Sequence, residues 1–169
     1  MSKALIRSMN RRGSRSDKSP LVTQKLKFSD PSLCDRCGAL YSEKVWRYGH
    51  RRAASKVMGK ARWVVCPGCA QAASGEYHGR VLIEVTDGAD RQNIVRRITN
   101  VERRARVTQP ERRIVSTKWN DKTLEILTTS QKLAHRIVHE VRKAFGGRAR
   151  FSWSNDDGSL LATLNLGSS

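Results

Sequence analysis

Two pairs of cysteines constrain this chain more than any other feature of its sequence. Each pair has two residues between its members: Cys34 with Cys37, and Cys66 with Cys69. This spacing lets both sulfurs of a pair face one ion about 2.3 Å away, and four such thiolates suit a tetrahedral zinc. Glycine or proline in and after each pair lets backbone amides turn toward the sulfurs. Because the chain has no other cysteine, we predict one structural zinc held by these four residues.

Other uses of the cysteines fit the sequence less well. A thioredoxin-like redox site needs one such pair beside a βαβ unit, whereas this chain has two matching pairs. Disulfides need an oxidising compartment, and residues 1–7 lack the apolar core of a secretory signal. Four thiolates leave no open coordination position, which predicts a structural rather than a catalytic metal. Iron remains an alternative occupant, and His50 or His78 can be a ligand only if one cysteine is spared.

The chain is strongly basic over its whole length. Its 169 residues include 33 Lys and Arg against 15 Asp and Glu, a net charge of +18. Residues 1–30, 31–80 and 81–169 each carry a net charge of +6. Such a distribution indicates a surface for a polyanion, and nucleic acid fits better than lipid because no basic stretch carries exposed aromatic or Leu residues at helical spacing. No apolar run approaches the roughly 20 residues of a membrane-spanning helix.

Composition divides the chain into three parts. Residues 1–30 are rich in Ser, Arg and Lys and are predicted to be a flexible basic arm, with a solubilising tail or a transit peptide as alternatives. Residues 31–79 contain the four cysteines and are predicted to form a zinc ribbon. The segment between the two pairs, residues 38–65, is predicted to be a loop or short helix on the metal-held base. Residues 80–169 are predicted to form a separate α+β domain.

The segment between the cysteine pairs combines basic and aromatic side chains. Its basic residues offer contacts to phosphates, and its aromatic rings offer stacking faces for bases. The alternative is that one or two of these aromatic rings cover the metal site. The predicted RNA-binding residues are Trp46, Arg47, Tyr48, Arg51, Arg52, Lys56, Lys60, Arg62 and Trp63.

From residue 80 onward, the apolar pattern alternates between strand and helix periods. Strands are predicted at residues 80–86, 112–118, 122–128, 148–154 and 159–166. Two helices have apolar stripes formed by Ile94, Val95, Ile98, Val101 and Ala105, and by Leu133, Ala134, Ile137, Val138, Val141 and Phe145. This order predicts a ferredoxin-like βαββαβ domain with an extra C-terminal strand, in which two helices cover one face of an antiparallel sheet.

The polar faces of the two predicted helices carry arginines and histidines whose roles have to be considered. The first helix carries Arg91, Arg96, Arg97, Arg103 and Arg104 on its polar side, which is either a phosphate track or an ordinary solvated face. His135 and His139 are four residues apart in the second helix, but Arg136 replaces the Glu of a zinc-protease motif, so we expect both to be solvated. The sequence contains no nucleophile arrangement, phosphate loop or convincing carboxylate pair, which argues against an enzyme.

Two segments resemble the nonsense-mediated-decay-three family, which contains the large-ribosomal-subunit export adaptor and its archaeal homologues. One is the cysteine set followed by the strand at residues 77–85, and the other is residues 124–147, a strand, a Thr/Ser cap and a basic helix ending in Phe-Gly-Gly. Members of that family are longer and carry a second set of zinc cysteines. The resemblance implies a zinc-ribbon module used on ribosomal RNA or ribosomal proteins, with Cys34, Cys37, Cys66 and Cys69 as the zinc ligands.

Together these features predict a non-enzymatic, cytoplasmic, zinc-containing RNA-binding protein that associates with the ribosome or its large-subunit precursor. Two alternatives from other classes remain at the level of the sequence. One is a DNA-binding regulator that uses the zinc ribbon, and the other is a protein–protein adaptor for an acidic partner.

Overall fold

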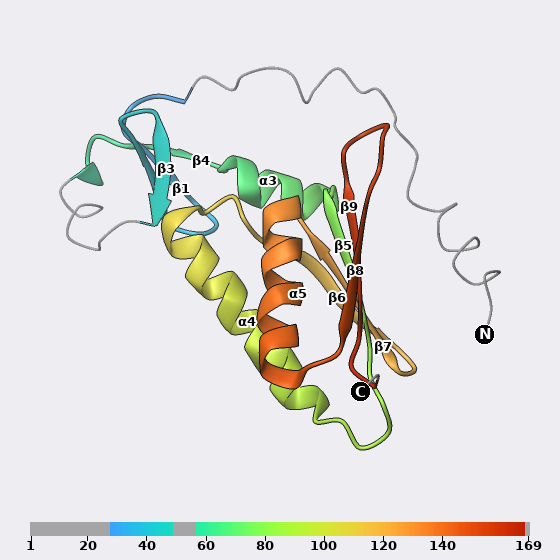
Figure 1. The fold of residues 1–169 in the computed structure, drawn as a ribbon. Helices are drawn as coiled ribbons and strands as arrows, with labels where there is room; N and C mark the ends of the chain where they lie inside the picture. The colour runs from blue at the N-terminus through green and yellow to red at the C-terminus, as the bar shows by residue number, and fades with distance from the viewer. Residues whose placement is uncertain (1–27, 49–56, 168–169) are drawn as a thin grey trace.

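The structure is a computed structural model that describes residues 28–48 and 57–167. In this part of the chain, three helices and two separate sheets form a mixed α+β architecture, which confirms the predicted α+β class but not its finer arrangement (Figure 1). The predicted basic arm lies almost entirely outside the described residues. In chain order, the elements are β1 (Ser32–Cys34), β2 (Ala39–Ser42), β3 (Val45–Tyr48), β4 (Arg62–Val64), α3 (Pro67–Ser74), β5 (Gly79–Glu84), α4 (Arg91–Thr108), β6 (Ile114–Asn120), β7 (Thr123–Thr128), α5 (Gln131–Phe145), β8 (Arg148–Trp153) and β9 (Leu160–Asn165).

The smaller sheet carries the first half of the cysteine motif. Its strand order is β3-β2-β1-β4, with β1 antiparallel to β2 and parallel to β4. The prediction of a loop or short helix for residues 38–65 is therefore wrong for most of the described part of this segment. Strands β2 and β3 form a hairpin whose two turn residues, Glu43 and Lys44, both have positive φ (53° and 63°). Such a turn matches the twist of the strands it joins, but it normally contains Asn or Gly, so Glu43 and Lys44 do not indicate a hairpin by residue type.

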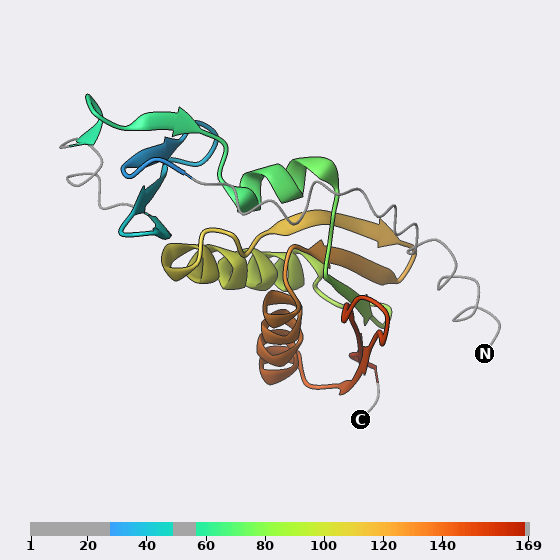
Figure 2. The ribbon, with the colours of Figure 1, turned by 90° about the horizontal axis from the view of Figure 1, so that it is seen from above.

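Helix α3 starts directly at the second cysteine pair. Cys66 is its N-cap residue and Pro67 follows at the start of the helix, where a missing amide proton costs nothing. The helix ends at Gly75, which has the left-handed conformation (φ 74°) typical of helix C-termini. Figure 2 shows α3 between the two sheets, so this short helix joins the cysteine-containing part to the rest of the chain.

The larger sheet departs from the predicted ferredoxin-like arrangement. Its strand order is β6-β7-β5-β9-β8, and β9 runs parallel to β5 while every other neighbouring pair is antiparallel. The expected antiparallel sheet is therefore a mixed sheet. The extra C-terminal strand does not extend the edge but lies between β5 and β8. Burial explains this order: β9 buries Leu160, Ala162 and Leu164, as a central strand must, whereas β8 has no fully buried residue and takes the edge.

Helices α4 and α5 lie on one face of the larger sheet (Figure 1) and enclose its core. The predicted stripe of α5 is buried except for the half-buried Phe145, and that of α4 is buried except for the half-buried Val95. Both helices begin at N-cap residues, because the side chains of Asp90 and Ser130 accept hydrogen bonds from backbone amides three residues later. Among the described helices, none is both long and apolar enough to cross a bilayer.

Candidate metal centre and basic surface

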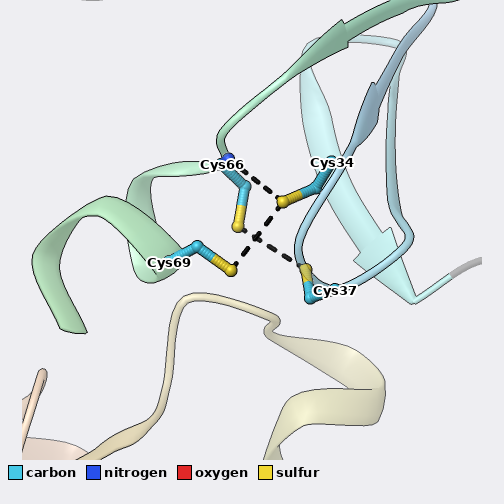
Figure 3. A group of neighbouring side chains, drawn as sticks. All are labelled: Cys34, Cys37, Cys66 and Cys69. Atoms are coloured by element: carbon cyan, nitrogen blue, oxygen red, sulfur yellow. Dashed lines mark hydrogen bonds between the residues drawn. The ribbon is translucent and has the colours of Figure 1, made fainter. Parts of the chain in front are cut away.

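The four cysteines converge on one point (Figure 3), and their sulfur atoms all lie within 4.8 Å of one another. Cys34 ends β1, Cys37 lies in the turn before β2, and Cys66 and Cys69 flank the start of α3. The sulfurs of Cys34 and Cys69 are 3.8 Å apart, and those of Cys37 and Cys66 are 3.7 Å apart. Four sulfurs about 2.3 Å from a central zinc would be about 3.8 Å apart. The cluster therefore has the dimensions of a tetrahedral metal site, and it could hold one metal ion.

The cysteine chemistry also fits a metal rather than a covalent link. All four thiols are free, and the sulfur separations far exceed the roughly 2.05 Å of a disulfide. The sulfurs of Cys37 and Cys66 are joined by a hydrogen bond, which lowers the pKa of Cys37 and raises the pKa of Cys66. These opposite shifts describe one proton shared between two sulfurs. A metal ion replaces such protons, because the thiolate is the ligand.

Backbone amides support the sulfurs as predicted. The amide of Cys66 lies 3.3 Å from the sulfur of Cys34 and donates to it. Gly38, directly after the first pair, has φ +69°, a backbone conformation that residues other than glycine rarely adopt. Its amide donates to the carbonyl of Cys34, which closes the turn that carries Cys37. The glycine is thus required by the turn geometry on which the ligand spacing depends.

Arg113 lies beside the cysteine cluster, a position that no sequence motif predicts. Its side chain is almost fully buried, and its Nη2 lies 4.0 Å from the sulfur of Cys66. Burial lowers the pKa of Arg113, but the negative charge of the nearby thiolates outweighs burial, so the pKa is raised overall. Four thiolates around a divalent ion carry a charge near −2. Arg113 therefore offsets part of this charge from outside the ligand set, and no motif spacing marks it because it lies 44 positions after Cys69.

A network of hydrogen bonds fixes Arg113 beside the cysteines. Its Nε donates to the carbonyl of Pro110 at 2.9 Å, and its backbone amide donates to Oγ1 of Thr129 at 2.9 Å. The same Thr129 hydroxyl donates to the carbonyl of Glu111 at 2.7 Å. A Cβ at Gly68 would lie 2.6 Å from Cα of Glu111, so the glycine between the second pair of cysteines allows α3 to approach this loop. The cysteine cluster is thereby docked onto the α+β core.

Trp46, one of the predicted RNA-binding residues, lies against the metal centre. It is half-buried and packs onto the cysteine cluster. Its ring also contacts the rings of Phe28 and Tyr41, with centroid distances of 5.1 Å and 5.2 Å. This placement favours the alternative stated for the aromatic residues, because the main contacts of Trp46 cover the metal site.

The other described members of the predicted RNA-binding set do not form one patch. Strands β3 and β4 are opposite edges of the smaller sheet. The strand register places Trp46, Tyr48 and Arg62 on one face and Arg47 and Trp63 on the other, since paired residues share a face. Trp63 is 55% exposed, and Lys60 is also exposed, just before β4. Arg51, Arg52 and Lys56 lie outside the described residues.

Tyr48 connects the smaller sheet to α4. Its hydroxyl accepts a hydrogen bond from Nη2 of Arg106 at 2.7 Å, and the guanidinium carbon of Arg106 lies 5.3 Å from the ring centroid. The C-terminal end of α4 accordingly lies beside β3 in Figures 1 and 2. This contact brings a residue of the predicted RNA-binding set next to the arginine-rich helix, which the sequence analysis treated as a separate feature.

The described histidines take no part in the cysteine cluster. Nε2 of His78 lies 3.7 Å from a carboxylate oxygen of Glu76, and His50 lies outside the described residues. His135 is exposed and stacks on Phe151 at a centroid distance of 4.7 Å, and His139 is exposed beside Glu140. Within the part of the chain that the structure describes, the four cysteines are the one group of three or more potential metal ligands.

Comparison with known proteins adds no assignment: the chain matches no family model, and no curated protein is detectably similar to it in sequence.

Proposed function

We propose that this protein is a non-enzymatic RNA-binding protein in which one structural zinc ion fixes a basic module beside an arginine-rich helix. Cys34, Cys37, Cys66 and Cys69 would hold the zinc, because soft thiolates at tetrahedral spacing favour zinc over hard cations. A four-thiolate sphere has no position left for a substrate, which supports a structural role for the metal. In this proposal, the smaller sheet and α3 act as a zinc-ribbon module.

The observation that carries the RNA-binding proposal is the junction of Tyr48 with Arg106. Two basic parts of the chain, the metal-held hairpin and helix α4, meet at this contact and can present one continuous surface. Of the six arginines of α4, only Arg97 has a carboxylate partner within 4.0 Å among the described residues. Guanidinium groups without a carboxylate partner, beside an exposed aromatic ring, suit phosphates and bases together.

The ribosome is the partner we propose for this surface, in the cytoplasm. This step rests on the resemblance of the cysteine set and residues 124–147 to the large-subunit export adaptor family. Ribosomal RNA offers many single-stranded loops, which are the usual targets of basic and aromatic surfaces. Contacts with phosphates make such binding sensitive to salt, so association should weaken as the ionic strength rises.

Sedimentation of a cell lysate on a density gradient tests this proposal. The chain is detected by blotting at low and high salt, with and without ribonuclease, and deoxyribonuclease treatment is the control. We expect the protein to travel with a ribosomal subunit at low salt and to move to the top at high salt or after ribonuclease. Release by deoxyribonuclease alone would indicate a DNA-binding regulator. Binding that survives both nucleases would indicate a protein adaptor, and either result would overturn the proposal.

A further inference from the structure

Three of the six arginines of helix α4 lie along one flank of the helix, and the predicted RNA-binding set does not include them. At about 100° per residue, Gln92, Arg96, Arg103 and Arg106 fall within a sector of about 80° on one flank. Arg97 and Arg104 lie on the other flank, where Arg97 approaches Glu140 of α5 at 3.7 Å. The only acidic residue of the helix, Glu102, accepts a hydrogen bond from the amide of Ile114. The arginine flank therefore meets no carboxylate from its own helix.

An aromatic hollow lies at the N-terminal end of this flank. It has a volume of about 360 Å³ and is lined by Arg91, Gln92, Val95, Arg96 and Trp119. The guanidinium carbon of Arg91 lies 4.6 Å from the ring centroid of Trp119, so the two planar groups form a platform. Trp119 comes from the edge strand β6 and packs partly against the core, which holds this platform in place.

A second, smaller hollow lies at the C-terminal end of the same flank. It has a volume of about 140 Å³ and is lined by Tyr48, Arg103, Arg106 and Val107. Here too an arginine faces an aromatic ring, and Tyr48 is 38% exposed. Arg106 is oriented by its hydrogen bond to the Tyr48 hydroxyl, so this hollow exists only where the metal-held hairpin meets α4.

From these observations we infer that the arginine flank of α4 is a binding track for single-stranded RNA, with one base-stacking site at each end. The inference rests on the proposed RNA binding and assigns it to a surface. Arg91 and Val107 are 16 residues apart, which corresponds to about 24 Å along the helix axis. Arg96 and Arg103 lie between the two hollows and contact phosphates, while an unstacked base sits against the Arg91–Trp119 platform and another against Tyr48.

The aromatic hollows are what distinguish a single strand from a duplex. A duplex keeps its bases stacked inside and offers phosphates and groove edges, so it could use the arginines but not the two hollows. Single strands expose base faces, and aromatic side chains that accept them occur together with a basic groove that follows the backbone. Along α4, the arginines lie between two hollows, and this arrangement fits the binding of a single strand.

Arg96→Ala and Arg104→Ala form a matched pair for testing this track. Both arginines are exposed on α4, and both variants remove one positive charge and introduce the same helix-favouring residue. Only Arg96 lies on the proposed flank. Arg96 marks one edge of the sector of about 80°, and Arg104 lies about 80° beyond that edge. The full-length, zinc-loaded chain is titrated against a labelled oligouridine of about ten nucleotides, within the usual range of site sizes. Duplex RNA of equal length is the comparison ligand.

We expect Arg96→Ala to reduce the slope of log Kd against log salt by about one, while Arg104→Ala leaves it unchanged. Tyr48→Leu should weaken oligouridine binding about 5- to 150-fold with little change in slope, whereas Tyr48→Phe, which keeps the ring, should bind within a few-fold of the parent chain. Circular dichroism of each variant confirms that it is folded.

Three results would overturn the inference in separable ways. Equal effects of Arg96→Ala and Arg104→Ala would mean diffuse attraction by net charge rather than a track. If the parent chain preferred duplex RNA over oligouridine at equal salt, the two hollows would not be base-stacking sites. Either result leaves the proposed RNA binding intact. Failure of the parent chain to bind any RNA, by contrast, would refute the proposed function itself.

Discussion

Replacing Gly68 by Ala is a direct test of how the metal centre is joined to the rest of the chain. Gly68 lies in the first turn of α3, between Cys66 and Cys69. An added Cβ would lie 2.6 Å from Cα of Glu111, 3.0 Å from the carbonyl oxygen of Pro110 and 3.1 Å from Nε of Arg113. The two nearest atoms belong to backbone, so they cannot move away by side-chain rotation. The loop and α3 must separate instead.

The size of the effect follows from two opposing contributions. Overpacking costs about 1–3 kcal/mol, and a backbone neighbour places this site in the upper part of that range. Replacing glycine by alanine in a helix returns up to about 1 kcal/mol. The free energy of unfolding should therefore fall by about 1–2 kcal/mol. For a chain of this length, such a loss lowers the Tm by about 2–8 °C.

Thermal unfolding of the zinc-loaded chain, followed by circular dichroism, measures this shift. Gly59→Ala is the control, because a Cβ at Gly59 meets nothing within 4 Å and its φ lies outside the left-handed region. We expect the Tm of the control to stay the same or rise slightly. A Gly68→Ala chain as stable as the parent would refute the close approach of α3 to the loop.

Three further substitutions test the contacts around this junction. Arg113→Gln removes the buried charge that faces the thiolates, so the free energy of unfolding measured by urea denaturation should fall by about 3 kcal/mol. An unchanged urea midpoint would show that Arg113 does not stabilise the site. Thr129→Val leaves the amide of Arg113 and the carbonyl of Glu111 without their partner, so the same assay should show a loss of about 1–3 kcal/mol, and a gain would contradict the network. Ser130→Ala removes the cap that binds the amide of Leu133 and should lower stability by about 0.5–2 kcal/mol in thermal unfolding; no change would mean the cap is dispensable.

Local signals predicted most of the elements in the second half of the chain. The 3.6-residue period of the apolar residues identified the buried stripes of both α4 and α5. The clustering of the four cysteines was also predictable, because their spacing is typical of residues that surround a tetrahedral ion. The helix stripes are formed by residues only a few positions apart. Paired cysteines are a residue pattern with few alternative uses.

Features that depend on distant residues could not be predicted in the same way. The position of β9 beside β5 depends on competition between β8 and β9 for the central place, which only the assembled core decides. Arg113 carries no motif, and its role arises because a loop after α4 reaches the cysteines. The β2–β3 hairpin was missed because Glu43 and Lys44 adopt a turn conformation that their residue types rarely indicate.

Ultraviolet crosslinking in cells that express the chain, followed by sequencing of the bound nucleic acid and mapping of the crosslinked peptides, tests RNA binding most directly. We predict crosslinks to ribosomal RNA, with nucleotide adducts on peptides that contain Tyr48 or Trp119, the aromatic residues of the two hollows. Recovery no greater than from unirradiated cells, or adducts only to DNA, would contradict the account of this protein as an RNA-binding protein.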